Sequence, residues 1–467
     1  MQPAPPAEPP PRPRTPFRLL ARSGRRHAIP WLSVKRWRRR LLLVGAALLA
    51  GLVAILFALG AELAIATHTD ILRVSPSLSL LLAPAGFAAM AWLSRNHFRG
   101  TQGSGIPQAI AAADSNDPAV RGQLLSLRLA FAKVALTLGG LLAGASIGRE
   151  GPSVQVGAAV LHSLAGRRFG RIASSRNLIV AGGAAGVAAA FNTPLGGIMF
   201  AIEEMCRHHA FRANSTTLTA VIFSGLMSLA LLGNYTYFGR TPATLAWPTV
   251  IWAVAACGAL GGALGGAFSR LLIASSRGLP GRIGEFARAR PVAFAALCGL
   301  GTALLGLATG GLTDGTGYAE SKAALEGTAG LPLYFFAAKM LAIWMAFLSG
   351  IPGGVFAPAL AAGAGVGTLV AHLLEPAPEA PILVLGMVAF LSAMTRAPIT
   401  SFVIVMEMTA NHEMLLPLMA TSLIAHGVSR SISPLALYDA LATATLRRTT
   451  VEVLSAATPR VQQQPAP

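Results

Sequence analysis

The sequence predicts an all-α polytopic membrane protein built from two structurally related halves. Hydrophobic residues make up 54% of the chain, charged residues only 12%, and the mean hydropathy is +0.60. An average soluble domain has about a quarter of charged residues, so the composition itself indicates a membrane protein. Apolar runs recur along the chain, and residues of the same type return at matching positions in its two halves.

The apolar runs differ in length, and this difference predicts broken helices. Some runs reach the roughly 20 residues needed to cross a bilayer, and others are shorter. We expect the shorter ones to form helices that end partway through the membrane. The runs cover residues 41–67, 78–92, 124–147, 178–202, 216–232, 247–273, 291–307, 333–348, 381–394 and 414–425.

The two halves share a spaced pattern of glycine, proline and glutamate. Gly-Arg-Glu-Gly-Pro at 148–152 is matched by Gly-Val-Phe-Ala-Pro at 354–358. In the first half, Pro194 lies 42 residues after Pro152, with Gly182 12 residues before it and Glu203 nine residues after it. In the second half, Pro398 lies 40 residues after Pro358, and Gly386 and Glu407 lie at the same distances from it. Repeated halves with glycine- and proline-broken apolar segments are typical of membrane transporters whose site lies where the halves meet.

The distribution of charge along the chain predicts that both termini are cytoplasmic and argues against nucleic acid as a partner. Eleven of the 37 Lys and Arg residues fall within 1–40, which is Pro- and Arg-rich and directly precedes the first apolar run. Basic residues beside a membrane helix mark the cytoplasmic side and favour anionic lipid. The run 41–67 is too long for a signal-peptide core. We therefore expect a cytoplasmic segment 1–40, a membrane domain 41–446 with halves of about 41–240 and 241–446, and a short cytoplasmic tail 447–467.

No pattern of metal, cofactor or enzyme chemistry is present in the sequence. Glu204 and His208 share a helical face, but no second group of ligands completes a site, and His412 lacks the second histidine of a zinc-protease motif. The cysteines Cys206, Cys257 and Cys298 are too widely spaced for a framework. An intramembrane protease needs paired aspartates, a Ser–His pair or a zinc motif, and ATP-driven transport needs a Gly-rich phosphate loop. The sequence shows none of these patterns. We therefore expect no metal, no cofactor and no enzyme.

Three turns that contain proline each predict the start of a helix. They lie at 103–107 (Gly-Ser-Gly-Ile-Pro), 151–152 and 357–358. Proline at a helix start leaves free backbone N–H groups pointing outward. Three helix N-termini directed at one point bind an anion through amides and partial charge. Because no lysine or arginine holds the anion by a full charge, it can also leave.

These motifs resemble the signatures of the CLC chloride channels and chloride/proton antiporters. The motifs at 103–107, 148–152 and 354–358 appear in family order, and 191–194 with 203–205 resembles a fourth block. The resemblance spans nearly all of 41–446. It implies a homodimer in which each subunit has its own pore, built from roughly eighteen helices in two inverted-topology repeats.

The resemblance also implies the residues of the chloride site. Ser104 would offer its hydroxyl to a central chloride, and the backbone N–H groups of Val355 and Phe356 would face the same ion. Tyr438 would add a phenolic hydroxyl from near the C-terminus. Two residues separate Leu435 from Tyr438 where the family usually reads Pro-Leu-Tyr, so this last match is weaker.

Two glutamates carry the implied proton chemistry. Glu150 would be the gate, since its carboxylate mimics chloride and swings aside once protonated. A bound anion nearby favours the protonated form by like-charge repulsion, which links chloride occupancy to protonation. The alternative is that Glu150 only caps a helix. Glu204 would be the internal proton glutamate, although it could also be a surface carboxylate, and its neighbour Glu203 could share either role. Glu407 is expected to pair with Arg396.

Two positions and the C-terminal region depart from the family pattern. Gln108 and Ile110 stand where the family often has acids, so Lys133 is left without an expected acidic partner and would seek carbonyl oxygens. The chain ends soon after Arg448 with no cystathionine-synthase-like regulatory domain, which resembles the minimal prokaryotic form.

Transport of chloride and protons across the cell's inner membrane is the implied function, with an antiporter favoured because exchangers usually carry the internal glutamate. A passive, possibly voltage-gated, chloride channel is the alternative. A fluoride-selective variant would alter the motifs around Ser104 and Glu150, which here are unaltered.

Overall fold

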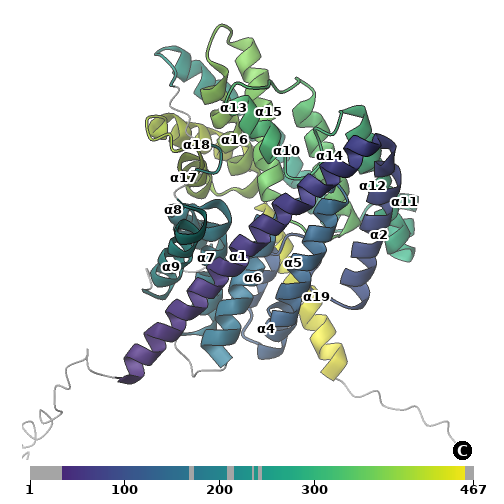
Figure 1. The fold of residues 1–467 in the computed structure, drawn as a ribbon, viewed down its shortest axis with the longest axis vertical. Coiled ribbons are helices and arrows are strands. Elements are labelled where there is room, and N and C mark those ends of the chain that lie inside the picture. The colour runs from purple at the N-terminus through teal and green to yellow at the C-terminus, as the bar shows by residue number, and fades with distance from the viewer. Residues whose placement is uncertain (1–33, 168–172, 208–214, 234–235, 240–243, 458–467) are drawn as a thin grey trace, which may run out of the picture. The chain divides into compact units, whose positions relative to one another are not determined.

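The computed structural model describes residues 34–167, 173–207, 215–233, 236–239 and 244–457 (Figure 1). The basic segment predicted at 1–40 lies mostly outside the described residues, as do His208 and the end of the predicted tail. Backbone contacts divide the chain into Met1–Leu41 and Leu42–Pro467. Within the described residues the secondary structure is helical, apart from two isolated bridges between motif loops, which confirms the predicted class.

The first half consists of long outer helices and short inner ones. α1 extends beyond the predicted apolar run, and the run 124–147 ends as a helix at Leu142, leaving a loop before the next helix. The elements are α1 (Val34–Val74), η4 (Pro76–Leu78), α2 (Ser79–Asn96), α3 (Ile106–Asp114), α4 (Pro118–Leu124), α5 (Leu127–Leu142), α6 (Glu150–Leu161), η5 (His162–Arg167), α7 (Ser175–Phe191), α8 (Pro194–Phe200), η6 (Ala201–Met205) and α9 (Ser215–Leu232).

The second half repeats this order, and a last helix returns to the first half. α19 contacts α3 and α4, and its yellow ribbon passes down from the green second-half helices in Figure 1. The elements are α10 (Thr249–Ser276), α11 (Gly281–Ala289), α12 (Pro291–Ala308), α13 (Tyr318–Leu325), α14 (Phe335–Ser349), α15 (Phe356–Leu373), α16 (Glu379–Thr395), α17 (Pro398–Thr409), α18 (Leu415–Ile432) and α19 (Leu437–Ala457).

Helix length separates membrane-crossing segments from buried half-helices. Seven segments of the described chain are long and apolar enough to cross a membrane, and α6 is not among them. α6 has 12 residues and all of them are buried. Proline and a left-handed residue end the other runs: Asn192 (φ 55°) stops α7 before Pro194, and Arg396 (φ 63°) stops α16 before Pro398. The predicted run 178–202 is therefore two helices.

Equivalent helices of the two halves pack against one another around a pseudo-two-fold axis. α2 packs on α12 and α8 on α17, while α6–α7 and α15–α16 form matching pairs within each half. Close packing is possible because glycines lie at the contacts. A side chain at Gly182 would meet the backbone of Ala158 at 2.7 Å, and one at Gly386 would meet the Cα of Gly367 at 2.7 Å. The glycines picked out by the repeat are thus contact residues.

Candidate functional site

The three motif loops meet at the centre of the molecule and are joined by backbone hydrogen bonds. Gly148 and Gly354, equivalent in the two halves, each donate to the other's carbonyl at 2.7 Å. Gly103 donates to Ile351 at 3.3 Å and accepts from Gly353 at 3.1 Å. The helices α3, α6 and α15 begin directly after these loops. Three helix N-termini therefore converge where the halves meet, as the sequence predicted.

Glycine is required in these loops because their backbones touch. A Cβ on Gly105, which has φ +106°, would lie 2.6 Å from the carbonyl oxygen of Gly151. One on Gly151 would collide with the Ser104 hydroxyl, and one on Gly354 would lie 3.0 Å from the Gly151 nitrogen. Only residues without a side chain let the three loops approach this closely.

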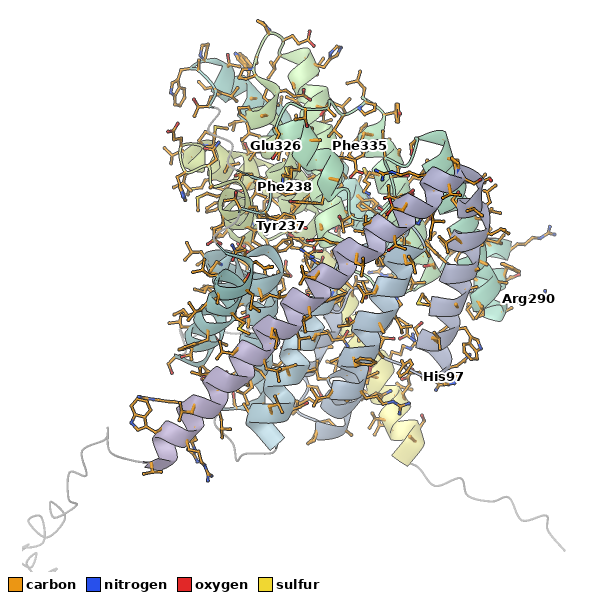
Figure 2. All side chains as sticks on the ribbon, in the orientation of Figure 1. His97, Tyr237, Phe238, Arg290, Glu326 and Phe335 are labelled. Carbon is orange, nitrogen blue, oxygen red and sulfur yellow. The ribbon has the colours of Figure 1, made fainter. Side chains whose placement is uncertain are left out.

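Ser104 and the first amides of α15 lie together in this region. Ser104 is 7% exposed, and its hydroxyl has no hydrogen-bond partner among the residues described. In α15 the first helical bond runs from Ala359 N–H to the Val355 carbonyl, so the earlier amides, including that of Phe356, lack a partner within the helix. The ring centroids of Phe356 and Phe191 lie 5.4 Å apart, and those of Phe191 and Tyr237 (labelled in Figure 2) lie 5.7 Å apart.

Glu150 is the first residue of α6 and is 1% exposed. Its carboxylate bends back over Gly148 and lies near the backbone amides of Glu150 itself and of Ala357. Neither oxygen has a partner in full hydrogen-bond geometry within the described chain. The carboxylate thus lies between the N-termini of α6 and α15, where partial positive charge stabilises an anion.

Tyr438 lies in the first turn of α19 and is completely buried. Its hydroxyl is close to that of Ser104, and it is within electrostatic range of both Glu150 and Glu204. The structure therefore brings Tyr438 to the other predicted site residues despite the weak local motif. The sequence could not show this, because the return of α19 to α3 is a tertiary contact.

A π-helical turn, η6, points two adjacent glutamates in different directions. Glu203 accepts hydrogen bonds from the amides of Ile399 (3.0 Å) and Thr400 (2.6 Å) at the start of α17. Glu204 is instead buried, at 2% exposed, and its Oε1 accepts from Arg207 at 2.9 Å. Single π turns are frequent at functional sites. Glu203 is a capping residue, and Glu204 is the inward carboxylate.

The predicted pair between Glu407 and Arg396 is wrong. Glu407 accepts from the amides of Leu195 (3.1 Å) and Gly196 (2.7 Å), so it caps α8 as Glu203 caps α17. The guanidinium of Arg396 donates to the carbonyl of Pro434 at 2.7 Å. A helix N-terminus offers a carboxylate both N–H donors and partial positive charge. Glu407 therefore binds the start of α8 and not the guanidinium of Arg396. The reciprocal caps confirm the repeat.

Lys133 does seek carbonyl oxygens. It is fully buried and donates to Thr101 at 2.7 Å and to Gly103 at 2.5 Å. Lys339 occupies the equivalent place in the second half and donates to Thr313 (2.9 Å), Asp314 (3.3 Å) and Gly315 (3.0 Å). Each lysine holds the loop that precedes a short helix, so Lys133 fixes the loop that carries Ser104.

Gln108 replaces an acid but still closes its loop. Its side-chain oxygen accepts from the Gly105 amide at 2.9 Å, and its side-chain nitrogen donates to the Gln102 carbonyl at 2.5 Å. A carboxylate could make only the first of these bonds. The neutral amide therefore caps α3 without placing a negative charge beside Ser104.

A cavity of about 350 Å³ reaches Ser104 from one side of the membrane domain. The arginines that line this cavity belong to none of the sequence motifs described above. Arg95 and Arg99 lie shortly before the motif at 103–107. The polar and charged lining residues include Arg95, Arg99, Gln108, Gln123, Arg448 and Glu452. Within the described chain no group of three or more His, Cys, Asp or Glu side chains converges as a metal site would require.

In this membrane protein, helix N-termini, a buried carboxylate and two hydroxyls meet where the two halves join, an arrangement suited to binding an anion. The comparisons identify the family. The model of the voltage gated chloride channel family matches residues 85–430. The chain therefore belongs to this family, known as CLC, which confirms the resemblance of its motifs.

Relatives and solved structures agree with this assignment. The H(+)/Cl(-) exchange transporter ClcA of Salmonella paratyphi A is 32% identical over 412 residues, 84% of both proteins. That of Citrobacter koseri is 32% identical over 404 residues, 80% of this chain and 79% of the relative. A slow cyanobacterial Cl-/H+ antiporter has the same fold, with a TM-score of 0.75 and 24% identity over 88% of this chain and 99% of that one. A CLC-type fluoride/proton antiporter has a TM-score of 0.72 and 22% identity over 87% and 98%.

Proposed function

We propose that this protein is a chloride/proton antiporter in which Glu150 is the gate. The main support for this proposal is the position of the Glu150 carboxylate between the N-termini of α6 and α15, a place suited to an anion. The names of its relatives, which are exchange transporters, support the same function.

Chloride binds through hydroxyls and amides in this proposal. The Ser104 and Tyr438 hydroxyls and the amides of Val355 and Phe356 surround the ion, and Lys133 stays tied to backbone carbonyls. Amide dipoles and hydroxyls stabilise an anion less strongly than a full cation does, so the ion can leave again.

Protonation of Glu150 links the two fluxes. A carboxylate and a chloride compete for the same amides, and a proton removes the charge that favours the carboxylate there. Glu204 passes protons between the cytoplasm and Glu150, and Tyr438 lies within electrostatic range of both. The proton route between Glu150 and the cytoplasm therefore passes through Glu204 and is separate from the chloride route.

A passive channel of the same family is the second candidate, because both classes share the pore. Purified protein in liposomes separates them: a chloride gradient is imposed and external pH is recorded. Chloride moving down its gradient should drive protons uphill in the opposite direction. A flat pH trace during chloride flow would assign the protein to the channels.

The same proposal includes a homodimer in a cell's inner membrane with both termini in the cytoplasm, surrounded by lipid and with no resident cofactor or metal. The support for the dimer is the chain's membership of the family, for which the motif resemblance implies a homodimer. Cross-linking in native membranes tests the dimer, and a monomer alone would contradict it.

A further inference from the structure

Arg207 connects the inward glutamate of one half to the end of a helix in the other. Its Nη2 donates to Glu204 Oε1 at 2.9 Å and to the carbonyl oxygens of Arg396 (3.2 Å) and Thr395 (3.4 Å). Thr395 ends α16, and Arg396 is its left-handed cap. No motif in the sequence singles out Arg207.

The two oxygens of Glu204 have different surroundings. Oε1 is held by Arg207, whereas Oε2 is buried and has no hydrogen-bond partner in the described part of the chain. The side chain of Glu204 is 1% exposed and that of Arg207 is 24% exposed, so the pair runs from the interior toward water. A buried carboxylate is costly without a partner, and Arg207 is the cation placed to stabilise it.

The contacts continue from Arg207 to the chloride site. Arg396, whose carbonyl accepts from Arg207, uses its own guanidinium to bind the carbonyls of Pro434 (2.7 Å) and Ser433 (3.5 Å). These residues directly precede α19, which carries Tyr438 in its first turn. One string of polar contacts thus joins Glu204 to the helix that supplies the phenol.

We propose that Arg207 is a positioning residue for the proton step, holding Glu204 as a carboxylate with Oε1 fixed and Oε2 left to accept the proton. This inference rests on the proposed role of Glu204. When Oε2 takes a proton from the cytoplasmic side, the attraction between two full charges is lost, while Oε1 still accepts the hydrogen bond from Arg207. No other bond forms or breaks.

Other charged groups surround the pair, but only Arg207 makes a direct hydrogen bond to Glu204 within the described residues. Its removal should therefore affect the carboxyl more than the removal of any neighbour. At longer range, Glu203 on η6 and Tyr438 and Asp439 on α19 act on Glu204, and Arg396 at the end of α16 and His426 on α18 act on Arg207. Further out, Arg430 on α18 acts on Arg396 and His426, and Arg176 and Asp114 act on Cys206.

Infrared difference titration tests the inference without transport. The spectrum of the Glu204→Gln protein is subtracted from that of the wild type across pH, which isolates the Glu204 carboxyl. The same subtraction is made in the Arg207→Gln background. Loss of the adjacent cation should move the midpoint of protonation upward by about one pH unit or more. Arg207→Lys, which keeps the charge, should stay near the wild-type midpoint.

Arg176→Gln is the matched control, because Arg176 is also 24% exposed and pairs with a different acid, Asp114, at 3.2 Å. The midpoint of Glu204 protonation should stay unchanged in Arg176→Gln. An unshifted midpoint in Arg207→Gln, or an equal shift in Arg176→Gln, overturns the inference. If the glutamine variant does not fold, Arg207→Met provides the second neutral substitution.

Transport assays on the same proteins keep this inference separate from the proposed function. Arg207→Gln should retain chloride flux and shift the pH profile of proton flux upward, and Arg207→Lys should restore the profile. If wild-type protein moves no protons, the antiporter proposal fails, while the infrared midpoint still decides whether Arg207 controls Glu204.

Discussion

Glu150 shows at the scale of one residue how a carboxylate can stand in for the transported ion. It is 1% exposed and lies near amides at the starts of both α6 and α15. A carboxylate buried in a membrane needs such partners, and these partners also suit chloride. In the proposed gate, the ionised carboxylate makes these capping contacts and the protonated side chain leaves them.

Replacing Glu150 with glutamine or alanine removes the titratable group at this place. Proton transport should fall to background, while chloride flux should persist and lose its dependence on pH. The pH electrode and a chloride electrode on one liposome sample measure both. Proton coupling that survives in either variant would place the gate elsewhere.

Glu203 and Glu204 should respond differently to the same substitution. Glu204→Gln should abolish proton movement and leave chloride flux, because Glu204 lies off the proposed chloride route. Glu203→Gln should keep coupling but lower stability by about 1 kcal/mol, since its hydrogen bonds to the α17 amides lose their charge. Glu407→Gln is the matched control and should lower the melting temperature similarly. Uncoupling by Glu203→Gln alone would exchange the two assignments.

The sequence predicted the site residues that belong to local motifs and missed those that depend on tertiary contacts. Glycine and proline spacing predicted the helix starts, and the resemblance of these local motifs to a known family implied the roles of Ser104, Glu150, Val355 and Phe356. Arg207 could not be predicted, because its partners include carbonyls at the far end of α16. The mistaken pairing of Glu407 has the same origin, since its true partners are 211 and 212 residues away in the chain.

At the scale of elements, the loops before α3, α6 and α15 act as one unit. Gly151 lies against Ser104 from the first loop and Gly354 from the third. A shift of any one loop therefore moves the start of a neighbouring helix. The starts of α3, α6 and α15 followed from the proline-containing turns, but the break within the run 178–202 and the π turn at η6 were not predicted.

Gly151→Ala tests this contact. The added methyl would meet the Ser104 carbonyl at 2.8 Å and the Gly354 Cα at 3.3 Å. Overpacking of this kind costs about 1–3 kcal/mol, and the displaced Ser104 should weaken chloride binding as well. Isothermal titration with chloride and a thermal melt measure both effects. Gly122→Ala, with nothing within 4 Å, is the control; equal behaviour of the two variants would contradict the packing argument.

At the scale of the whole molecule, a cavity lies beside each of two equivalent loops, and residues of both halves line each cavity. Gly315-Thr316-Gly317 matches Gly103-Ser104-Gly105, and each loop is held by an equivalent lysine. A second cavity, of about 460 Å³, lies beside the 315–317 loop. α2 begins at this cavity with Ser79 and ends at the other with Arg95, so the two cavities lie at opposite ends of one membrane-crossing helix.

The two cavities share their architecture but differ in charge. Counting from Gly103 and Gly315, Arg95 corresponds to Leu307 and Arg99 to Gly311. Gln102 and Gln108 correspond to Asp314 and Glu320 in the second cavity. Three arginines and one acid line the Ser104 cavity, whereas one arginine and two acids line the second cavity. The field at the Ser104 cavity therefore favours anions more strongly.

Arg95→Gln should raise the chloride concentration for half-maximal transport by about twofold when chloride enters from the Ser104 side, as expected for one charge acting through water. The effect should vanish near 1 M salt, where charges are screened within about 3 Å. Chloride entering from the other side should be unaffected, because that cavity has leucine at the equivalent position. Arg290→Gln, at an exposed arginine beside α11 (Figure 2), controls for overall charge. Equal effects from both sides would mean that Arg95 acts through the fold rather than through the field at one mouth.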